Sequence, residues 1–243
     1  MTGAGAGTGV SGVDAVIFDW GGTLTQWHDI DFHAESLALA QAVVAADHDL
    51  EVSRERLLAA GDVVWGRSRD HQQSATVADL FTVAGLEHDP ELLAGYYDFW
   101  APHTATDPEV IPLWEGLRER GIRVGVLSNT IWPREVHEGF FERDGVRHLI
   151  DGDVYTSEIP WTKPSPRAFG AAMQAVGASD PSRCVYVGDR LFDDIWGARN
   201  AGLRAIHIPH SVIPPSQVGH TEGDPDAVAH RLADVLTIVD NWR

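Results

Sequence analysis

Two carboxylates stand at the ends of short apolar runs. Asp19 follows the run Ala-Val-Ile-Phe at 15–18, and Asp189 follows the run Cys-Val-Tyr-Val at 184–187 after one glycine. Short apolar runs bounded by glycine are typical of buried parallel strands. The carboxyl ends of such strands meet at one edge of the sheet, where α/β proteins place their chemistry. Carboxylates can act there as nucleophiles or as oxygen ligands for Mg²⁺, so we predict a carboxylate site at that edge.

Two more polar motifs lie between these carboxylates along the chain. Ser128 and Asn129 follow the apolar run 124–127, and Lys163 is the only lysine among the 243 residues. A serine after a strand is usually a turn residue, and a lone lysine is usually a surface residue. Their position between the two carboxylates favours a shared role in one site.

In order and spacing, these motifs resemble the haloacid dehalogenase superfamily of aspartate-nucleophile hydrolases, from about Val13 to His207. The resemblance implies that Asp19 is the nucleophile of a phosphoryl transfer. It also implies a Mg²⁺ site formed by Asp19, the backbone carbonyl of Gly21 and Asp189. Such a metal offsets the repulsion between a carboxylate nucleophile and an anionic substrate.

The resemblance assigns the remaining motif residues to the phosphoryl group. Ser128 is expected to act in catalysis by holding a phosphoryl oxygen, with Asn129 and Gly22 as substrate-binding residues. Lys163 is expected to neutralise the nucleophile and the phosphoryl charge. Asp194 matches the second acidic position of the fourth motif and is expected to support the metal shell or Lys163.

Gly21 stands where typical phosphatases of the superfamily carry an aspartate that protonates the leaving group and then activates water. Glycine can do neither. The run Asp-Trp-Gly-Gly-Thr at 19–23 is similar to the phosphonoacetaldehyde hydrolase branch, which carries Asp-Trp-Ala-Gly-Thr and forms a Schiff base with a lysine of its cap. Residues 33–100 contain no lysine, which disfavours that carbon–phosphorus chemistry. The dehalogenase branch also fits poorly, because it uses a different residue at this position and no metal.

A polar cluster follows the first motif and consists of His28, Asp29, Asp31 and His33. These residues could supply a substitute acid–base group near the nucleophile. They could equally form a metal site, or a solvated hinge without chemical function. The sequence leaves these three interpretations open.

The predicted fold class is α/β, a Rossmann-like doubly wound parallel sheet, because strand-like and helix-like segments alternate along the chain. We expect strands near 14–20, 122–127, 154–155, 184–187 and 204–208. A last helix is expected over 225–239.

Residues 33–100 show helical spacing and no strand alternation. We expect helices over 34–46, from an N-cap at Ser53 to about 65, over 75–84 and over 90–100. The predicted organisation is a disordered tail at 1–12, a hydrolase core formed by 13–31 and 102–243, and an α-helical cap inserted at 32–101.

The formal net charge is −18, from 36 acidic and 18 basic residues. Such a surface repels nucleic acid and anionic membranes, so neither is expected as a partner. Residues 1–12 lack the basic and apolar regions of a signal peptide. The single cysteine, Cys184, cannot form a disulfide within the chain, which fits a cytoplasmic protein.

The sequence therefore predicts a Mg²⁺-dependent hydrolase that acts on a small phosphorylated metabolite through an aspartyl-phosphate intermediate. One alternative is a catalytically weak protein that binds or senses a phosphometabolite, because Gly21 lacks the acid. Another is a phosphonatase-like hydrolase of carbon–phosphorus bonds. The motifs select neither a substrate nor an oligomeric state.

Overall fold

A single parallel sheet forms the centre of the protein in the computed structural model, which describes residues 12–44, 49–214 and 218–243. The strand order is β3-β2-β1-β4-β5-β6, and every neighbouring pair is parallel. The strands are β1 (Ala15–Phe18), β2 (Arg123–Ser128), β3 (Gly152–Tyr155), β4 (Cys184–Gly188), β5 (Arg204–His207) and β6 (Ala227–Val228). The predicted α/β fold with a parallel sheet is confirmed. The predicted tail lies, apart from Gly12, outside the described residues.

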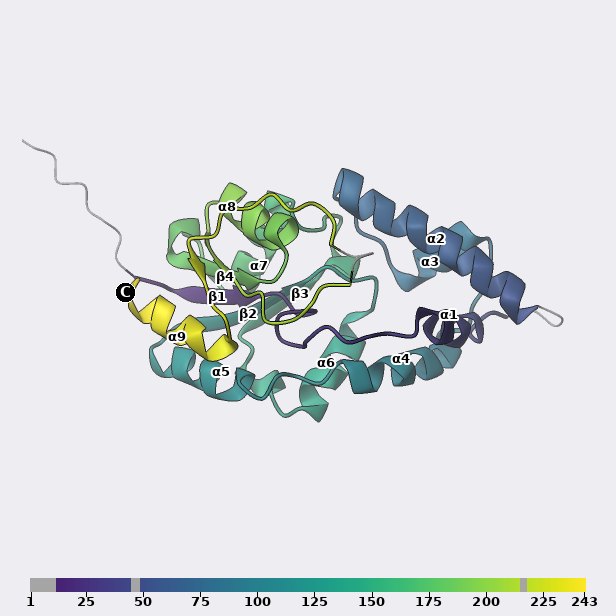
Figure 1. Cartoon of the computed structure of the whole chain (residues 1–243), viewed down its shortest axis with the longest axis horizontal. Helices are drawn as coiled ribbons and strands as arrows, with labels where there is room; N and C mark the ends of the chain where they lie inside the picture. Colours follow the sequence, from purple (N-terminus) through teal and green to yellow (C-terminus); the bar gives the residue numbers. More distant parts are fainter. Residues whose placement is uncertain (1–11, 45–48, 215–217) are drawn as a thin grey trace, which may run out of the picture.

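Helices cover both faces of the sheet (Figure 1). The helices that follow the first segment of the chain are α5 (Val110–Glu119), α6 (Arg134–Arg143), α7 (Pro166–Ala175), α8 (Gly197–Asn200) and α9 (Leu232–Asp240). Helices α7 and α8 lie on one face, and α5 and α9 pack together on the other. Alternate side chains of β1 point to opposite faces of the sheet. Val16 and Phe18 belong to one apolar cluster, and Ala15 and Ile17 belong to the other.

The segment between β1 and α5 is helical, as predicted, and extends to one side of the sheet (Figure 1). It contains α1 (Phe32–Ala40), α2 (Leu50–His71), α3 (Val77–Ala84), α4 (Ala94–Trp100) and the 3₁₀ turns η1 (Pro90–Leu93) and η2 (Ala101–His103). We call residues 32–101 the cap insertion. Its limits as a domain stay a prediction.

The expected N-cap at Ser53 is wrong. Helix α2 begins one turn earlier, where the Asp49 carboxylate accepts hydrogen bonds from the backbone N–H groups of Glu51 and Val52. Ser53 lies inside the helix and is buried. Both residues have good N-cap side chains, so residue type alone does not distinguish between these two starts.

The expected helix over 225–239 is also wrong in its first half. Residues Ala227–Val228 instead form β6. The preceding residue, Asp226, binds β5, since its Oδ2 accepts the Ala205 N–H at 2.8 Å. Helix α9 starts only at Leu232, where the Asp234 carboxylate accepts the N–H groups of the preceding turn. None of the described helices is both long and apolar enough to cross a membrane.

Four short connections before or after the strands are single turns. They are the 3₁₀ turns η3 (Arg147–Leu149), η4 (Thr156–Glu158) and η5 (Pro181–Arg183), and the π-helical turn η6 (Leu191–Trp196). Turn η6 follows β4 directly and continues into α8. A π-turn often marks a functional site, and this one carries Asp193 and Asp194.

Candidate active site

The amine of Lys163 lies at the centre of a buried polar cluster. Its Nζ donates to Asp19 Oδ1 at 2.6 Å, to Asp194 Oδ1 at 2.7 Å and to the Tyr186 hydroxyl at 2.9 Å. All four side chains are almost completely buried. The Tyr186 hydroxyl in turn donates to the Leu127 carbonyl at 3.0 Å. The three donor directions of the ammonium are therefore all used, which holds Asp19 in a defined position.

The sheet register brings these groups together. Strand β1 lies between β2 and β4, and Phe18 pairs with Val126 on one side and Val187 on the other. Asp19, the next residue, donates its N–H to the Val187 carbonyl at 2.9 Å. The carboxyl ends of the three strands consequently present Asp19, Ser128 and the Gly188-Asp189 pair at one edge, as the sequence predicted.

Asp189 is held beside the first motif by a tryptophan. The Trp27 Nε1–H donates to Asp189 Oδ2 at 2.7 Å, whereas the buried Oδ1 has no hydrogen-bond partner among the described residues. Gly22 lies beneath this contact with φ of +88°, and a Cβ there would overlap both the carboxylate and the indole. Gly22 is thus required for close packing, and its carbonyl accepts from His210 Nε2 at 2.9 Å.

Gly21 has a different environment from Gly22. Its φ lies outside the left-handed region, and a Cβ built on it meets nothing within 4 Å. A side chain is therefore compatible with both the backbone and the space at this position. The fold therefore does not require a glycine at position 21. The missing acid is a difference in chemistry from typical phosphatases of the superfamily.

The carboxylates of the site repel one another in a buried setting. One oxygen each from Asp19, Asp189 and Asp194 lies within 4.8 Å of the others. Burial raises the pKa of Asp19 to about 6, with the Asp194 charge adding to it and Lys163 opposing it. Burial, together with the charges of Asp19 and Asp194, likewise raises the pKa of Asp189 to about 8.

A divalent cation fits this arrangement. The oxygens are hard carboxylate ligands, which suit Mg²⁺, and Asp189 Oδ1 is a buried acceptor without a hydrogen-bond partner among the described residues. The positive charge would relieve the effects of burial and of mutual repulsion, which together raise the two carboxyl pKa values. Lys163 does not supply this relief for Asp189, because its three donors go to Asp19, Asp194 and Tyr186.

The second motif supports the Lys163 loop as well as the cavity. Ser128 ends β2, is buried and lines the cavity next to Asp19. The Asn129 side chain clamps the Lys163 backbone, since its Oδ1 accepts the Lys163 N–H at 2.8 Å and its Nδ2 donates to the Lys163 carbonyl at 3.1 Å. The sequence assigned Asn129 only to substrate binding, so this positioning contact is an additional finding.

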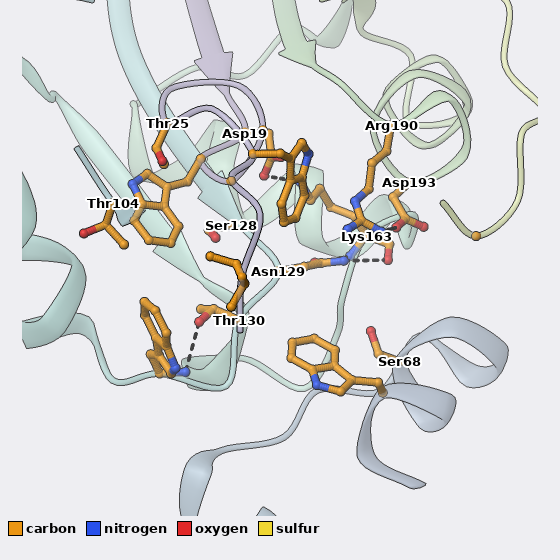
Figure 2. Close-up of a pocket in the computed structure, with 18 of the residues that line it drawn as sticks. Asp19, Thr25, Ser68, Thr104, Ser128, Asn129, Thr130, Lys163, Arg190 and Asp193 are labelled. Atoms are coloured by element: carbon orange, nitrogen blue, oxygen red, sulfur yellow. Dashed lines mark hydrogen bonds and ion pairs between the residues drawn. The ribbon is translucent and has the colours of Figure 1, made fainter. Parts of the chain in front are cut away.

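A cavity of about 430 Å³ opens above these groups. Core residues Asp19, Ser128 and Lys163 line one side, and residues of α2, among them Ser68, line the opposite side (Figure 2). The cap insertion and the sheet edge thus share one cavity.

The polar cluster of His28, Asp29, Asp31 and His33 lies entirely within the described residues, and only its His28 borders this cavity. Asp31 is the N-cap of α1 and accepts the N–H groups of His33 and Ala34 at 3.1 and 3.0 Å. Asp29 is exposed. Asp31 therefore has a structural role as a helix N-cap, whereas His28 borders the cavity near His103, with 5.8 Å between the ring centroids.

Residues 13–202, more than half of the chain, match the haloacid dehalogenase-like hydrolases. The chain belongs to the haloacid dehalogenase-like hydrolase family. The match covers β1, the cap insertion and the strands that carry the site.

Two relatives of this hydrolase indicate the range of its family. It is 28% identical to the glyceraldehyde 3-phosphate phosphatase of Methanopyrus kandleri (strain AV19) over 232 residues, 93% of this chain and 97% of the relative. It is 28% identical to the phosphonoacetaldehyde hydrolase of Pseudomonas fluorescens (strain SBW25) over 207 residues, 81% and 72% of the two chains. A haloacid dehalogenase-type phosphatase from Thermococcus onnurineus shares the fold, with a TM-score of 0.68 at 22% identity over 95% and 100% of the chains.

Two residues of the candidate site were not predicted from the sequence. Tyr186 looks like one more apolar strand residue of β4, and only the sheet face it occupies brings its hydroxyl to Lys163. Trp27 lies in a loop, where its aromatic character gave no signal for the bond to Asp189. Both contacts span more than 20 residues in the sequence and depend on tertiary packing.

Proposed function

We propose that this family member is a Mg²⁺-dependent phosphatase that transfers the phosphoryl group of a small phosphate ester to Asp19 and then to water. The contact of Lys163 with Asp19 and Asp194, next to the unpartnered oxygen of Asp189, carries the proposal. A purely structural ion pair would not require a third buried carboxyl group beside it, because a buried oxygen without a partner destabilises the fold.

The proposed reaction consists of two displacements at phosphorus. Asp19 attacks phosphorus through a carboxylate oxygen, the phosphorus–oxygen bond to the leaving alcohol breaks, and an acyl phosphate forms on Asp19. Water then cleaves this acyl phosphate, which releases inorganic phosphate and restores the carboxylate. Lys163 keeps Asp19 oriented and lowers the cost of bringing an anionic phosphoryl group beside it.

Asp19, Asp189 and the Gly21 carbonyl would hold the cation, and Asp194 would act through Lys163. Bound Mg²⁺ would supply positive charge for the phosphoryl oxygens. Ser128 and the backbone around Gly22 and Asn129 border the cavity where those oxygens would lie. We propose these residues as the phosphoryl-binding part of the site.

The carbon–phosphorus alternative finds little support in the structure despite the relative named phosphonoacetaldehyde hydrolase. A Schiff base requires a free amine that can reach the substrate. Lys163 is the only lysine, and its Nζ is buried in contacts with two carboxylates and a phenol. Burial alone lowers the pKa of Lys163, but Asp19 and Asp194 outweigh that effect and keep the amine protonated and non-nucleophilic.

The test is hydrolysis of acetyl phosphate and 4-nitrophenyl phosphate with and without Mg²⁺. We expect Mg²⁺-dependent turnover that falls to background in Asp19→Asn. In isothermal titration, Asp189→Ala should lose saturable Mg²⁺ binding. Asp29→Asn is the control, because Asp29 is an exposed aspartate outside the cavity and should behave like the wild type. Activity near wild type in Asp19→Asn would refute the proposal.

A further inference from the structure

The cavity has an unusually aromatic wall. Five of the nine tryptophans border it. Two of them have a face covered by another group: Trp20 stacks on Phe140 with 6.2 Å between ring centroids, and Trp27 lies under the Arg190 guanidinium at 5.4 Å. These rings serve the protein's own packing.

Trp65 is the exception among the five. Trp100 and Trp132 pack on each other with 5.5 Å between ring centroids, but Trp65 has no ring or cation contact among the described residues. Its side chain borders the cavity and is 45% exposed. An indole left open to water inside a cavity is a surface available for a ligand.

Helix α2 directs Trp65 toward the cavity. Its buried face, formed by Leu57, Ala60 and Val64, packs within the cap insertion, where α2 contacts α1 and α3. A second face of α2 borders the cavity. Its residues lie at helical spacing and are Asp62, Trp65, Ser68 and Arg69. The indole is therefore on the helix face that looks across at Asp19 and Lys163.

A direct contact fixes this face relative to the site. The Ser68 hydroxyl donates to Thr162 Oγ1 at 3.0 Å, and the Thr162 N–H donates to the Gln72 carbonyl at 3.1 Å. Thr162 precedes Lys163, whose amine holds Asp19. Figure 2 shows Ser68 on α2 across the cavity from Lys163 and Asp19. Trp65 is less than one helical turn from Ser68, so its position is fixed relative to the segment that carries Thr162 and Lys163.

We infer that Trp65 is a stacking surface for the leaving group, and that the substrate is a phosphate monoester whose alcohol carries a planar aromatic ring. The inference rests on the proposed phosphatase function. The cavity of about 430 Å³ lies within the range of roughly 300 to 1,000 Å³ typical of pockets for larger organic ligands. An aromatic ring of the substrate stacked on Trp65 would remove both apolar surfaces from water. The Asp62 carboxylate borders the same cavity and would accept a hydrogen bond from a polar edge of the substrate ring.

The test compares two substrates with the same primary alkyl phosphate and different attached groups, adenosine 5′-monophosphate and ribose 5-phosphate. Stacking of a base on an aromatic side chain predicts a KM lower by roughly 5- to 100-fold for the nucleotide. Trp65→Ala should remove most of this difference by raising the KM of the nucleotide alone. Trp65→Phe should keep part of it. Val63→Ala, on the same helix, 44% exposed and outside the cavity, should change neither KM.

Binding to the Asp19→Asn variant, measured by calorimetry with Mg²⁺, separates this inference from the proposed function. If acetyl phosphate is hydrolysed but the two ligands bind equally, the aromatic subsite is wrong and the phosphatase stands. If no ester is hydrolysed but the nucleotide binds more tightly in a Trp65-dependent way, the subsite stands and the phosphatase is wrong. An equal loss of affinity for both ligands in Trp65→Ala would also overturn the inference, because it would assign Trp65 to closure of the cavity.

Discussion

At the scale of single residues, Gly21 is the position where function can be gained. Its backbone conformation and the open space around it admit a side chain. Gly21→Asp should therefore raise kcat on alkyl phosphates such as glycerol phosphate, since a positioned general acid contributes roughly 10² to 10⁴ in rate. Hydrolysis of 4-nitrophenyl phosphate should change far less, because its leaving group needs little protonation. Parallel kinetics on both esters measure the effect.

The variant must bind Mg²⁺ with wild-type affinity for this comparison to hold, which titration calorimetry checks. No gain on alkyl phosphates in such a variant would mean that another group already protonates the leaving oxygen. His28 and His103 are then the side chains to replace, because both border the cavity with 5.8 Å between their rings.

Lys163 should matter for stability as well as for catalysis. Lys163→Met keeps most of the volume but leaves Asp19 and Asp194 buried without their cation. Removing one partner of a buried pair typically costs about 3 to 5 kcal/mol. Urea unfolding should show a loss of this size. Adding Asp194→Asn to Lys163→Met should recover part of it, and a double variant no more stable than the single one would argue against charge burial as the cause.

At the scale of one element, α6 carries a buried histidine that links stability to pH. His137 is fully buried, stacks on Tyr155 and contacts the Thr130 hydroxyl at 3.1 Å. Burial, with a smaller effect of the Arg134 charge, lowers the pKa of His137 to about 3. The unfolded chain binds a proton at this residue near pH 6.5. Between these values the unfolded state holds more protons, so stability falls as the pH falls below about 6.5.

His137→Gln should weaken this dependence. The histidine alone accounts for roughly 2 kcal/mol of lost stability at pH 5, from about 1.5 pH units at 1.36 kcal/mol each. The free energy of unfolding, measured in urea at pH 7.5 and pH 5, should therefore fall less in His137→Gln than in the wild type. His148→Gln removes an exposed histidine and serves as the control. Equal pH dependence in the two variants would contradict the assignment.

At the scale of the whole molecule, one apolar cluster runs from the sheet into the cap insertion. It contains Val16 and Phe18 of β1 together with Leu57, Phe81 and Tyr96 of the insertion. The junction is aromatic, and the Trp132 Nε1–H donates to the Tyr96 hydroxyl at 3.2 Å. The predicted core and cap are thus joined by shared packing in addition to their two connections.

Joining residues 13–31 directly to 102–243 should therefore give a poorly stable core. The excision uncovers Trp132, which is 7% exposed in the whole protein and packs against Tyr96, Tyr97 and Trp100. Calorimetry should show one cooperative transition for the full chain and a transition lower by tens of degrees, or none, for the core. A core that melts within a few degrees of the full chain would show that the insertion is an independent domain.

Local sequence determined the strands and the identity of the polar residues at their ends. The apolar runs before Asp19, Ser128 and Asp189 are short and bounded by glycine or polar residues, so each specifies a buried strand without help from distant segments. Three such strands in one parallel sheet necessarily bring their ends to one edge. The grouping of Asp19, Ser128 and Asp189 was predictable for that reason, whereas their proposed roles depend on the family resemblance and on experiment.

Tertiary structure alone decided the contacts that depend on distant partners. Ser53 is buried inside α2, and β6 pairs with β5, more than 20 residues away in the sequence, so local sequence revealed neither arrangement. Tyr186 and Trp27 entered the site through contacts with residues 23 and 162 positions away. The open face of Trp65 could not be predicted from the sequence either. Periodicity shows which side of a helix is apolar, but it does not show which tryptophan packs against another ring in the folded protein.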